Sequence, residues 1–293
     1  MEIRQLKTFK TVATLLSFTQ AAQHLNYAQS SISAQIQALE DELAVKLFDR
    51  LGRRILLTEA GERLLLYAGK LLDLVEETKT EVAEASQPQG SLTIRVPETL
   101  VVHYLPPVIK RFQRRFPQVG LLFTTCAHEG LQKDLRKGLT DLAFIMADSI
   151  QATDLVSEAL GFEPLMVVAH PQHPLAAKPV VRTSDFHGQT FLFSRVDCSY
   201  RRVFQQVLTQ ADVRPGGLLE FNSIAAIKQC VMAGIGITVM PQVAVAEEIT
   251  TGRLAILAWE EGPLETALLM IWFKEKWLSP TITAFMEMVR TAV

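Results

Sequence analysis

The stretch YAQSSISAQIQALEDEL, residues 27–43, places amide and hydroxyl side chains on one face of an expected helix. Its apolar residues recur at steps of four, three and four from Ile32 to Leu43, which is the spacing of one buried stripe of an α-helix. The opposite face lacks the Lys/Glu mixture of an ordinary solvated surface. Glutamine and serine can hydrogen-bond to base edges in a major groove, glutamine by a bidentate contact with adenine. The predicted base or phosphate contacts on this helix are Gln29, Ser30, Ser31, Ser33, Ala34, Gln35 and Gln37.

The residues in front of this helix decide against a surface helix that is merely rich in glutamine. SFTQAAQHL, residues 17–25, has the apolar spacing of a second short helix, and NYA then interrupts the pattern for about one turn. The small residues Ala21 and Ala22 would let two helices cross closely. An apolar stripe between Ile3 and Leu16 would close a three-helix core. The order of these parts predicts a helix-turn-helix.

A basic hairpin is expected directly after these helices, in LFDRLGRRILLTEAG, residues 47–61. Gly52 marks a turn between two short extended runs, and Arg50, Arg53 and Arg54 cluster at its tip. Arginines at a hairpin tip suit phosphate or minor-groove contacts. A solvated basic loop is the alternative, but the position directly after a helix-turn-helix favours DNA.

Composition bounds the class of protein. The chain has 293 residues, enough for about two domains. It is 48% hydrophobic and 20% charged, it holds no apolar run of 18 residues, and its first residues lack a signal-peptide core, so we expect a cytoplasmic protein without a membrane span. The formal net charge of −2 does not exclude DNA binding, because only local basic residues are needed.

The motifs of catalysis and metal binding are missing from the sequence. The cysteines Cys126, Cys198 and Cys230 are widely spaced and form neither a metal motif nor a disulfide framework. There is no Gly-rich phosphate loop, zinc constellation or nucleophile elbow, because the glycines of MAGIGI follow a helix instead of a strand. We therefore predict no catalytic residues, no metal and no cofactor, and we expect the protein not to be an enzyme.

A long helix is expected at Thr58–Ala85, where strong helix formers run without a proline. Its apolar residues follow alternating steps of four and three, which is typical of a coiled-coil seam, and the same helix of a second chain is the simplest partner. A dimer would present two reading heads to a two-fold symmetric operator. SQPQGS, residues 86–91, then reads as a hinge. The predicted dimer contacts are Leu64, Ala68, Leu71, Val75 and Val82.

From Leu92 onward, short apolar runs alternate with helical patterns, and the alternation restarts near residue 164. This predicts βαβ units around largely parallel strands, arranged as two Rossmann-like subdomains with a cleft between them. The predicted boundaries are 1–58 for the winged helix-turn-helix domain, 59–90 for the linker helix and hinge, and 91–293 for the second domain, in which the first subdomain takes about 91–161 plus 266–293 and the second about 162–265.

The order of these parts resembles the LysR-type transcriptional regulators over essentially the whole chain. The marks are SFTQAAQHL with QSSISAQIQALEDEL, then KLFDR with RRILLTEAG, YLPPVIKRFQRRFPQV, and SIAAIKQCVMAGIGITVMP. The resemblance implies a winged helix-turn-helix that binds promoter DNA and a dimeric linker helix. It also implies a small-molecule effector domain similar to type 2 periplasmic binding proteins, with two subdomains joined by two crossover strands, and a homotetramer built as a dimer of dimers.

Two positions depart from the family pattern. Ala28 stands where a Ser or Thr usually caps the recognition helix, and losing an N-cap costs about 1 kcal/mol. Asn26 is not placed to replace that cap. Ala34 stands where the family often has Arg, so one major-groove contact is lost or becomes apolar, for example with a thymine methyl group.

In an open α/β sheet, ligands bind outside the carboxyl ends of the strands, near helix N-termini. The resemblance places the effector at the same positions. Helix N-termini favour anions, so a small carboxylate is the leading effector class, although Glu98 opposes it unless it points away or pairs with Arg201 or His128. The predicted effector contacts are Thr99, Leu100, Cys126, His128, Met146, Cys198, Ser199, Tyr200, Asn222 and Ser223.

The second domain also admits other readings. Ser199 and Ser223 would also serve as plain helix caps, and His128 as a surface residue. Cys198 precedes a helix N-terminus, which would lower a thiol pKa, but no second cysteine lies between Ser199 and Gln229 to form a disulfide switch. A solute-binding protein would fit the second domain alone, and the N-terminal head disfavours it.

Overall fold

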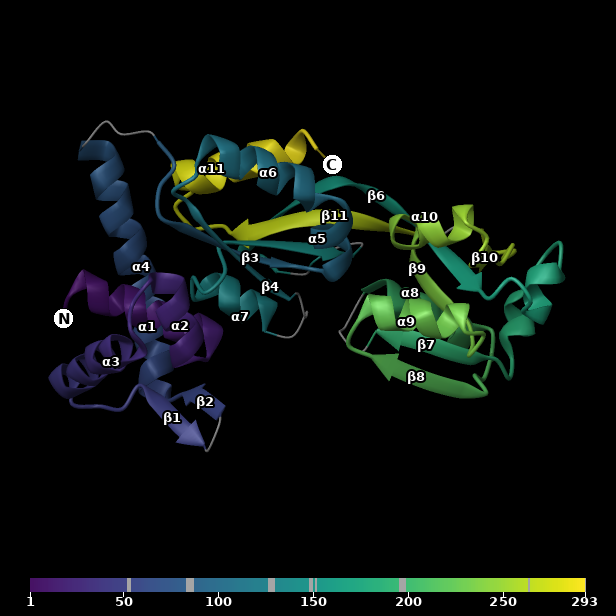
Figure 1. Ribbon diagram of the computed structural model, residues 1–293, viewed down its shortest axis with the longest axis horizontal. Coiled ribbons are helices and arrows are strands. Elements are labelled where there is room, and N and C mark those ends of the chain that lie inside the picture. Colours follow the sequence, from purple (N-terminus) through teal and green to yellow (C-terminus); the bar gives the residue numbers. More distant parts are fainter. Residues whose placement is uncertain are drawn as a thin grey trace.

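A computed structural model of the chain describes residues 1–51, 54–82, 87–125, 130–147, 150, 152–194, 199–262 and 264–292. An N-terminal head, a long helix and a two-lobed second domain follow one another along the chain (Figure 1). The head and the long helix consist of α1 (Ile3–Leu15), α2 (Phe18–Leu25), α3 (Gln29–Leu43), β1 (Phe48–Leu51), β2 (Arg54–Leu57) and α4 (Glu59–Val82).

The head encloses a small core of its own. Helices α1, α2 and α3 contribute fully buried side chains to this core, namely Phe9, Ala21, Ile32 and Leu39. Leu65 of α4 is also fully buried in it. The predicted turn holds, because Asn26 takes a left-handed φ of 56° between α2 and α3. β1 and β2 pair antiparallel as the expected hairpin. The head is therefore a winged helix-turn-helix, and the first half of α4 packs against its core.

The second domain begins with a sheet that both subdomains share. Its strand order is β10-β6-β11-β5-β3-β4, with β9 also paired to β6, and a separate two-stranded sheet joins β7 to β8. β3 pairs parallel with β4 and β5, whereas β6 and β11 run antiparallel to their neighbours. The strands are β3 (Ser91–Val96), β4 (Gly120–Thr125), β5 (Leu142–Met146), β6 (Leu155–Ala169), β7 (Thr190–Ser194), β8 (Gly217–Phe221), β9 (Thr238–Pro241), β10 (Ala255–Ile256) and β11 (Leu264–Phe273).

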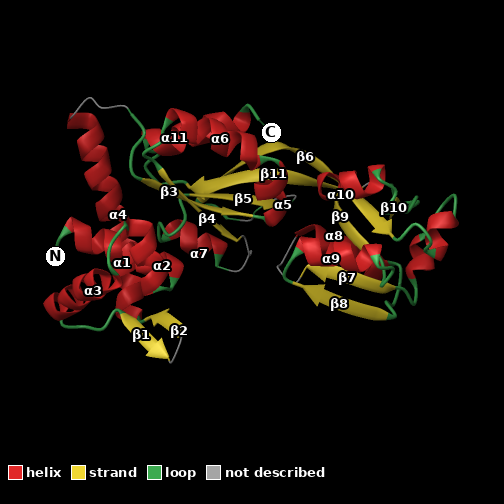
Figure 2. Cartoon of the chain, in the orientation of Figure 1, coloured by secondary structure: helices red, strands yellow, loops and turns green. Residues whose placement is uncertain are grey.

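Helices cover both faces of the sheet in the first subdomain (Figure 2). Phe144 and Met146 of β5 join the core under α6 and α11, while the alternate residues Ala143 and Ile145 face α7. This alternation is what a sheet covered on both sides requires. The helices of the second domain are α5 (Glu98–His103), α6 (Leu105–Arg115), α7 (Leu131–Arg136), α8 (Ser199–Gln210), α9 (Ile224–Met232), α10 (Gln242–Thr250) and α11 (Pro280–Arg290).

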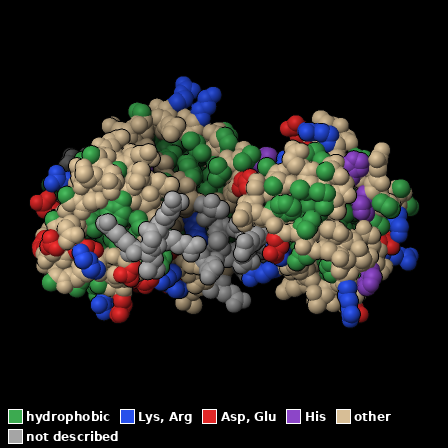
Figure 3. Space-filling model, turned by 60° about the horizontal axis from the view of Figure 1, so that its bottom comes forward, with side chains coloured by type: hydrophobic (Ala, Val, Ile, Leu, Met, Phe, Trp, Pro, Cys, Tyr) green, Lys and Arg blue, Asp and Glu red, His purple; other side chains and the backbone are tan. Residues whose placement is uncertain are grey.

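β6 and β11 are the two strands that pass from one subdomain to the other, as the resemblance implies. β11 pairs with β6 along its whole length, from Leu155 opposite Phe273 to Leu165 opposite Leu264. The second subdomain forms the right-hand lobe in the space-filling view, with apolar side chains exposed on the face turned toward the viewer (Figure 3). Its interior is a cluster of aromatic rings in which Phe204 contacts Phe186, Phe191 and Trp259.

The sequence patterns missed some elements and overextended others. β7 and the short helix α5 were not expected, and β6 begins nine residues before the apolar run that predicted it. The apolar run at residues 253–259 predicts a strand, and the structure confines that strand to Ala255 and Ile256. Across the described part of the chain, no helix is long and apolar enough to cross a membrane.

Candidate functional site

The polar face of α3 is open to solvent. Ser30, Ser31, Ala34 and Gln37 are exposed, and Ser33 is partly buried, while Ile32, Ile36 and Leu39 lie in the core. The helix therefore presents the side chains that the sequence predicted for base reading and buries the apolar stripe. The hydroxyl and amide groups can donate to or accept from base edges, and Ala34 offers a methyl group among them.

Intrahelical hydrogen bonds orient two of these amides before any ligand arrives. Gln29 Nε2 donates to Ser33 Oγ at 3.1 Å, which leaves its carbonyl oxygen and one N–H for a bidentate contact with adenine. Gln37 Nε2 donates to Asp41 Oδ1 at 2.6 Å, and Lys46 Nζ donates to Gln37 Oε1 at 3.4 Å. Gln29 is therefore better prepared for base contact than Gln37, whose amide is engaged at both ends.

Gln35 has a structural partner that the sequence did not reveal. Its Oε1 accepts a hydrogen bond of 2.8 Å from the hydroxyl of Thr8, a residue of α1 that is only 1% exposed. This bond ties the recognition helix to the first helix. The predicted phosphate contact of Gln35 is left to its amide nitrogen.

The start of α3 has no side-chain cap, as Ala28 predicted. We expect Ala28→Ser to supply the missing acceptor for the first-turn N–H groups and to stabilise the helix start by about 1 kcal/mol. Hydrogen exchange of the first-turn amides should then slow by about fivefold. Ala38→Ser, at an exposed position in the middle of the same helix, is the control and should slow nothing. Equal exchange in Ala28→Ser and the native chain would show that another group already satisfies these amides.

Of the three acids at the far end of α3, only Glu40 is buried, at 7% exposed. It holds the segment that leads to the wing. Its Oε1 accepts from the backbone N–H of Leu47 at 2.8 Å, and its Oε2 accepts from Lys46 Nζ at 2.7 Å. Glu40 thereby fixes the segment that leads from the recognition helix into β1. The side chains of Arg50, Arg53 and Arg54 lie outside the described residues, so their predicted contacts stay a prediction.

The linker helix α4 buries part of its predicted dimer seam against the head of its own chain and leaves other apolar side chains exposed. Ala68 is fully buried and Leu64 partly buried against the core of the head in the same chain, so neither faces outward. Val75 is partly buried. The apolar side chains that α4 exposes form what we call the outward stripe, consisting of Tyr67 at 60%, Leu71 at 36%, Leu74 at 57% and Val82 at 80%.

Two of the predicted effector contacts have side chains turned into the core of the first subdomain. Leu100 and Met146 are 3% and 4% exposed within that core, and the Leu100 N–H already donates to the carbonyl of Pro97. Both side chains pack inward, Leu100 from α5 and Met146 from the end of β5. Thr99 is also buried, at 3%. Asn222 is exposed and Ser223 half-buried at the start of α9.

The remaining predicted contacts fall outside what the structure describes. Cys126, His128 and Cys198 are not described at all, and Ser199 and Tyr200 are described only as the first residues of α8. Their roles stay predictions.

A hydrogen bond joins the two subdomains at Glu98. Its Oε2 accepts a hydrogen bond of 3.3 Å from the backbone N–H of Ile224, the first residue of α9. Ser223 occupies the N-cap position of α9 but makes no capping bond, so the carboxylate takes its place. Of the two partners that the sequence offered for Glu98, Arg201 is engaged elsewhere, with Glu220 at 2.5 Å and the Ser194 carbonyl at 2.7 Å. A helix start in the second subdomain therefore already holds an anion supplied by the first.

Glu163, on the crossover strand β6, binds groups from both subdomains. This buried carboxylate accepts from the Tyr104 hydroxyl of the first subdomain and from the Val243 N–H of α10 at 2.8 Å. Burial, followed by the hydrogen bond to Glu163, raises the pKa of Tyr104 well above its usual range. The hydroxyl therefore stays protonated and remains a hydrogen-bond donor to Glu163.

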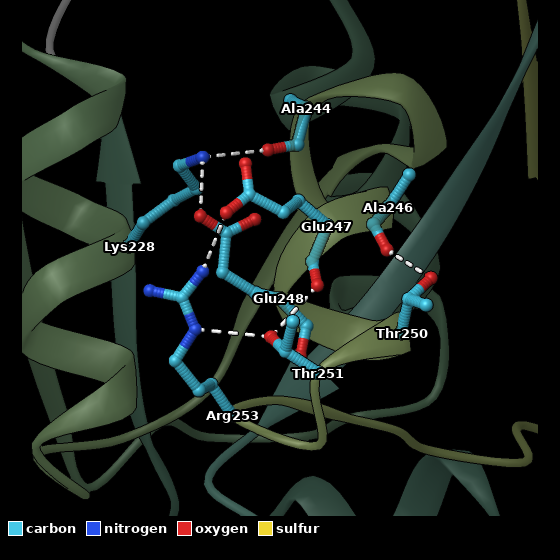
Figure 4. A network of polar contacts seen from close by, with 8 residues as sticks. All are labelled: Lys228, Ala244, Ala246, Glu247, Glu248, Thr250, Thr251 and Arg253. Carbon is cyan, nitrogen blue, oxygen red and sulfur yellow. Dashed lines mark hydrogen bonds and ion pairs between the residues drawn. The ribbon is translucent and has the colours of Figure 1, made fainter.

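An ion pair between half-buried Lys228 and buried Glu248 joins α9 to α10 (Figure 4). Lys228 Nζ donates to Glu248 Oε1 at 2.8 Å and to the Ala244 carbonyl at 2.9 Å. Burial alone would raise the pKa of Glu248, but the hydrogen bond from Lys228, a backbone hydrogen bond and the positive charges of Lys228 and Arg253 together lower it. This contribution to stability is present above the ordinary glutamate pKa and is lost as pH falls through the lowered one.

We expect Lys228→Met to lower the free energy of unfolding of the second subdomain by about 2 kcal/mol, because it leaves the Glu248 carboxylate buried without a cation. The loss should shrink in acid, where the carboxylate becomes protonated. Urea denaturation at pH 7 and pH 4.5 measures both effects. Arg253→Met removes the more exposed partner of Glu247 and should change stability by less than about 0.5 kcal/mol. Equal losses in the two variants would contradict this assignment.

Comparison with known proteins agrees with this arrangement. The family model described as bacterial regulatory helix-turn-helix protein, lysR family, matches residues 3–62, and the model of the LysR substrate binding domain matches residues 85–293. An uncharacterized HTH-type transcriptional regulator of Bacillus subtilis, YwqM, is 40% identical over 292 residues and covers 99% of both chains.

Solved structures show the same fold. A full-length OxyR variant from Pseudomonas aeruginosa has a TM-score of 0.72 at 23% identity and covers 100% of this chain and 94% of its own. Full-length CbnR complexed with target DNA has a TM-score of 0.55 at 24% identity, covering 100% and 99%. The CcmR regulatory domain of Synechocystis in complex with 2-PG has a TM-score of 0.63 at 24% identity, covering 69% and 97%. With an exposed reading helix on a winged head and a two-lobed domain on crossover strands, this chain belongs to the LysR family of DNA-binding transcriptional regulators, which are not enzymes.

Proposed function

We propose that a dimer of this chain reads a two-fold symmetric promoter site through the polar face of α3. The observation that carries the proposal is the exposure of Ser30, Ser31 and Gln37 together with the pre-oriented amide of Gln29. Hydrogen-bonding side chains on a solvent-facing helix in a winged head are suited to the major groove. The structure of the relative CbnR, solved with its target DNA, supports this mode of binding. We infer that the protein acts in the cytoplasm, where promoter DNA lies.

The outward stripe of α4 supports the dimer. Tyr67, Leu71 and Leu74 are separated by steps of four and three, so they lie on one face of the helix, and each is at least one third exposed. A single chain leaves this face in water, and a second copy of the same helix would cover it. The exposed Leu218 and Leu219 on the edge strand β8 offer a further contact, in keeping with a homotetramer built from two dimers.

We infer further that a small anion, most simply a carboxylate, binds in the cleft and modulates promoter binding. Support comes from the first N–H group of α9, which already receives the Glu98 carboxylate and so can hold an anionic oxygen. The regulatory domain of the relative CcmR was solved in complex with 2-PG. An effector would stabilise one arrangement of the subdomains, and a coupling free energy of a few kcal/mol suffices to alter DNA binding.

Two measurements test these proposals separately. A gel-shift titration with the DNA upstream of its own coding sequence should give a sequence-dependent complex that weakens steeply with salt. A complex that random DNA of equal length competes away equally well would contradict promoter reading. A thermal-shift screen of small carboxylates and aromatic acids on the full chain should raise the melting temperature for at least one of them, and a flat screen would contradict an anionic effector.

A further inference from the structure

The linker helix α4 rests on the first subdomain of its own chain along a third face. Glu62, Gly69 and Asp73 are separated by steps of seven and four, so they share one side of the helix, distinct from the side that packs into the head and from the outward stripe. Glu62 binds Lys133 at 2.9 Å and Lys137 at 3.0 Å, both on or just after α7. The head is therefore docked on the effector domain and does not hang from the hinge alone.

Gly69 marks the closest approach of the two parts. A Cβ built at Gly69 would lie 3.1 Å from the carbonyl oxygen of Lys137 and 3.7 Å from the Cα of Gly138. Gly138 has a φ of +65°, which favours glycine there as well. Two glycines thus let the helix backbone meet the loop before β5 without intervening side chains.

A buried charge cluster completes the contact. Lys276 has a side chain only 3% exposed, and its Nζ lies 3.0 Å from Asp73 of α4 and 3.0 Å from Asp141, the residue before β5. Asp141 also accepts from the Thr93 N–H of β3 at 2.7 Å. Burial alone would lower the pKa of Lys276, but the two aspartates outweigh it and raise the pKa, so the ammonium stays charged. Displacing α4 would take one of its two anionic partners from this buried ammonium and leave it with Asp141 alone, which opposes the displacement.

Lys276 lies just after a strand that connects the two subdomains. It follows by three residues the end of β11, one of the two strands that cross to the second subdomain, and β11 pairs with β5. β11 therefore connects the second subdomain to the segment that carries Lys276, and Lys276 contacts the helix that leads to the head.

We propose that Lys276 is a positioning residue that fixes the angle of the DNA-binding head and conveys the arrangement of the two subdomains to it. The inference rests on the proposed function, because the angle matters only if two heads bind one duplex. Asp73 is the partner of Lys276 on helix α4, and Asp141 is its partner beside the sheet. The cluster acts on the geometry of bound DNA without touching the bases.

The test compares Asp73→Asn with the native full-length chain on DNA upstream of its own coding sequence. Asp73→Asn removes the negative charge that α4 offers to Lys276. Lys276 keeps its ion pair with Asp141, so we expect the fold to be retained. We expect affinity for a single half-site within about twofold of native, an altered DNA bend in a circular-permutation assay, and hydrogen exchange in residues 69–79 about tenfold faster. Gly69→Leu should give the same pattern by steric displacement, since leucine is a good helix former.

Glu76→Gln is the matched control, because it removes a half-exposed carboxylate from the same helix and should leave bend and exchange as in the native chain. A native bend with native exchange in both Asp73→Asn and Gly69→Leu would overturn the proposal. Loss of half-site affinity would also overturn it, because the contact would then support the head itself instead of its angle. If the native chain bound no promoter DNA, the proposed function would fail, while the exchange experiment would still report on the docking of α4.

Discussion

Leu71→Glu combined with Leu74→Glu should convert the dimer into a monomer and lower affinity for the full operator by about 100-fold or more. Both leucines lie on the outward stripe of α4, where they are 36% and 57% exposed, so the substitutions disturb no contact within the core of the chain. Two linked heads bind a duplex with the second contact made intramolecular, which typically strengthens binding by about 10²–10⁴-fold. Sedimentation equilibrium measures the mass, and gel-shift titration on full and half operators measures the affinity.

Lys70→Glu provides a control with the same change in net charge. Lys70 is exposed on the same helix beside the outward stripe, so its substitution adds equal repulsion from phosphates without burying a charge between two chains. We expect it to remain dimeric and to lose affinity equally on half and full operators. A double variant that is still dimeric, or a monomer that binds the full operator like the native chain, would contradict the dimer contact.

Gly61→Ala should unfold the head or destabilise it by about 3 kcal/mol. A Cβ at Gly61 would lie 2.2 Å from the backbone carbonyl oxygen of Leu47 and 2.9 Å from a methyl carbon of Leu57. The backbone cannot retreat easily, because the Gly61 N–H donates to Thr58 Oγ1 at 3.0 Å and Leu47 is held by Glu40. Although alanine is the better helix former, the clash with backbone outweighs that gain. DNA binding should be lost together with the protection of head amides from hydrogen exchange.

Gly120→Ala tests whether the loss is specific to that close approach. A Cβ at Gly120 would meet Ser91 Cβ at 3.5 Å, which is ordinary van der Waals contact, so stability should change by less than about 1 kcal/mol. A Gly61→Ala chain that melts and binds DNA like the native one would show that the wing and α4 can separate at no cost.

Local patterns in the sequence predicted the head well. The 3.6-residue spacing in α3 identified Ile32, Ile36 and Leu39 as buried, although Leu43 at the end of the stripe is exposed. The three-residue turn at Asn26 separates α2 from α3. Thr58 was read as the start of the long helix, and its hydroxyl does cap that helix. These features are set by residues a few positions apart, where propensity and periodicity hold the information.

Contacts between distant residues could not be read from the same patterns. The apolar spacing of α4 showed that its residues must be buried, but it could not assign Ala68 to the head and Leu74 to the outside. Glu98 and Ile224 are 126 residues apart, and Lys276 and Asp73 are 203 residues apart. No local signal marks such pairs, because an acid or a lysine in a polar segment is usually solvated.

The most direct measurement of promoter reading by α3 is the affinity of native and Gln29→Ala chains for every single-base variant of the operator. If the amide of Gln29 reads a base, discrimination should fall by about 1–3 kcal/mol at one symmetry-related position in each half-site and stay unchanged elsewhere. Binding to random DNA should keep its native affinity and salt dependence. A uniform loss over all sequences, or an unchanged preference at every position, would contradict a polar recognition helix lying in the major groove.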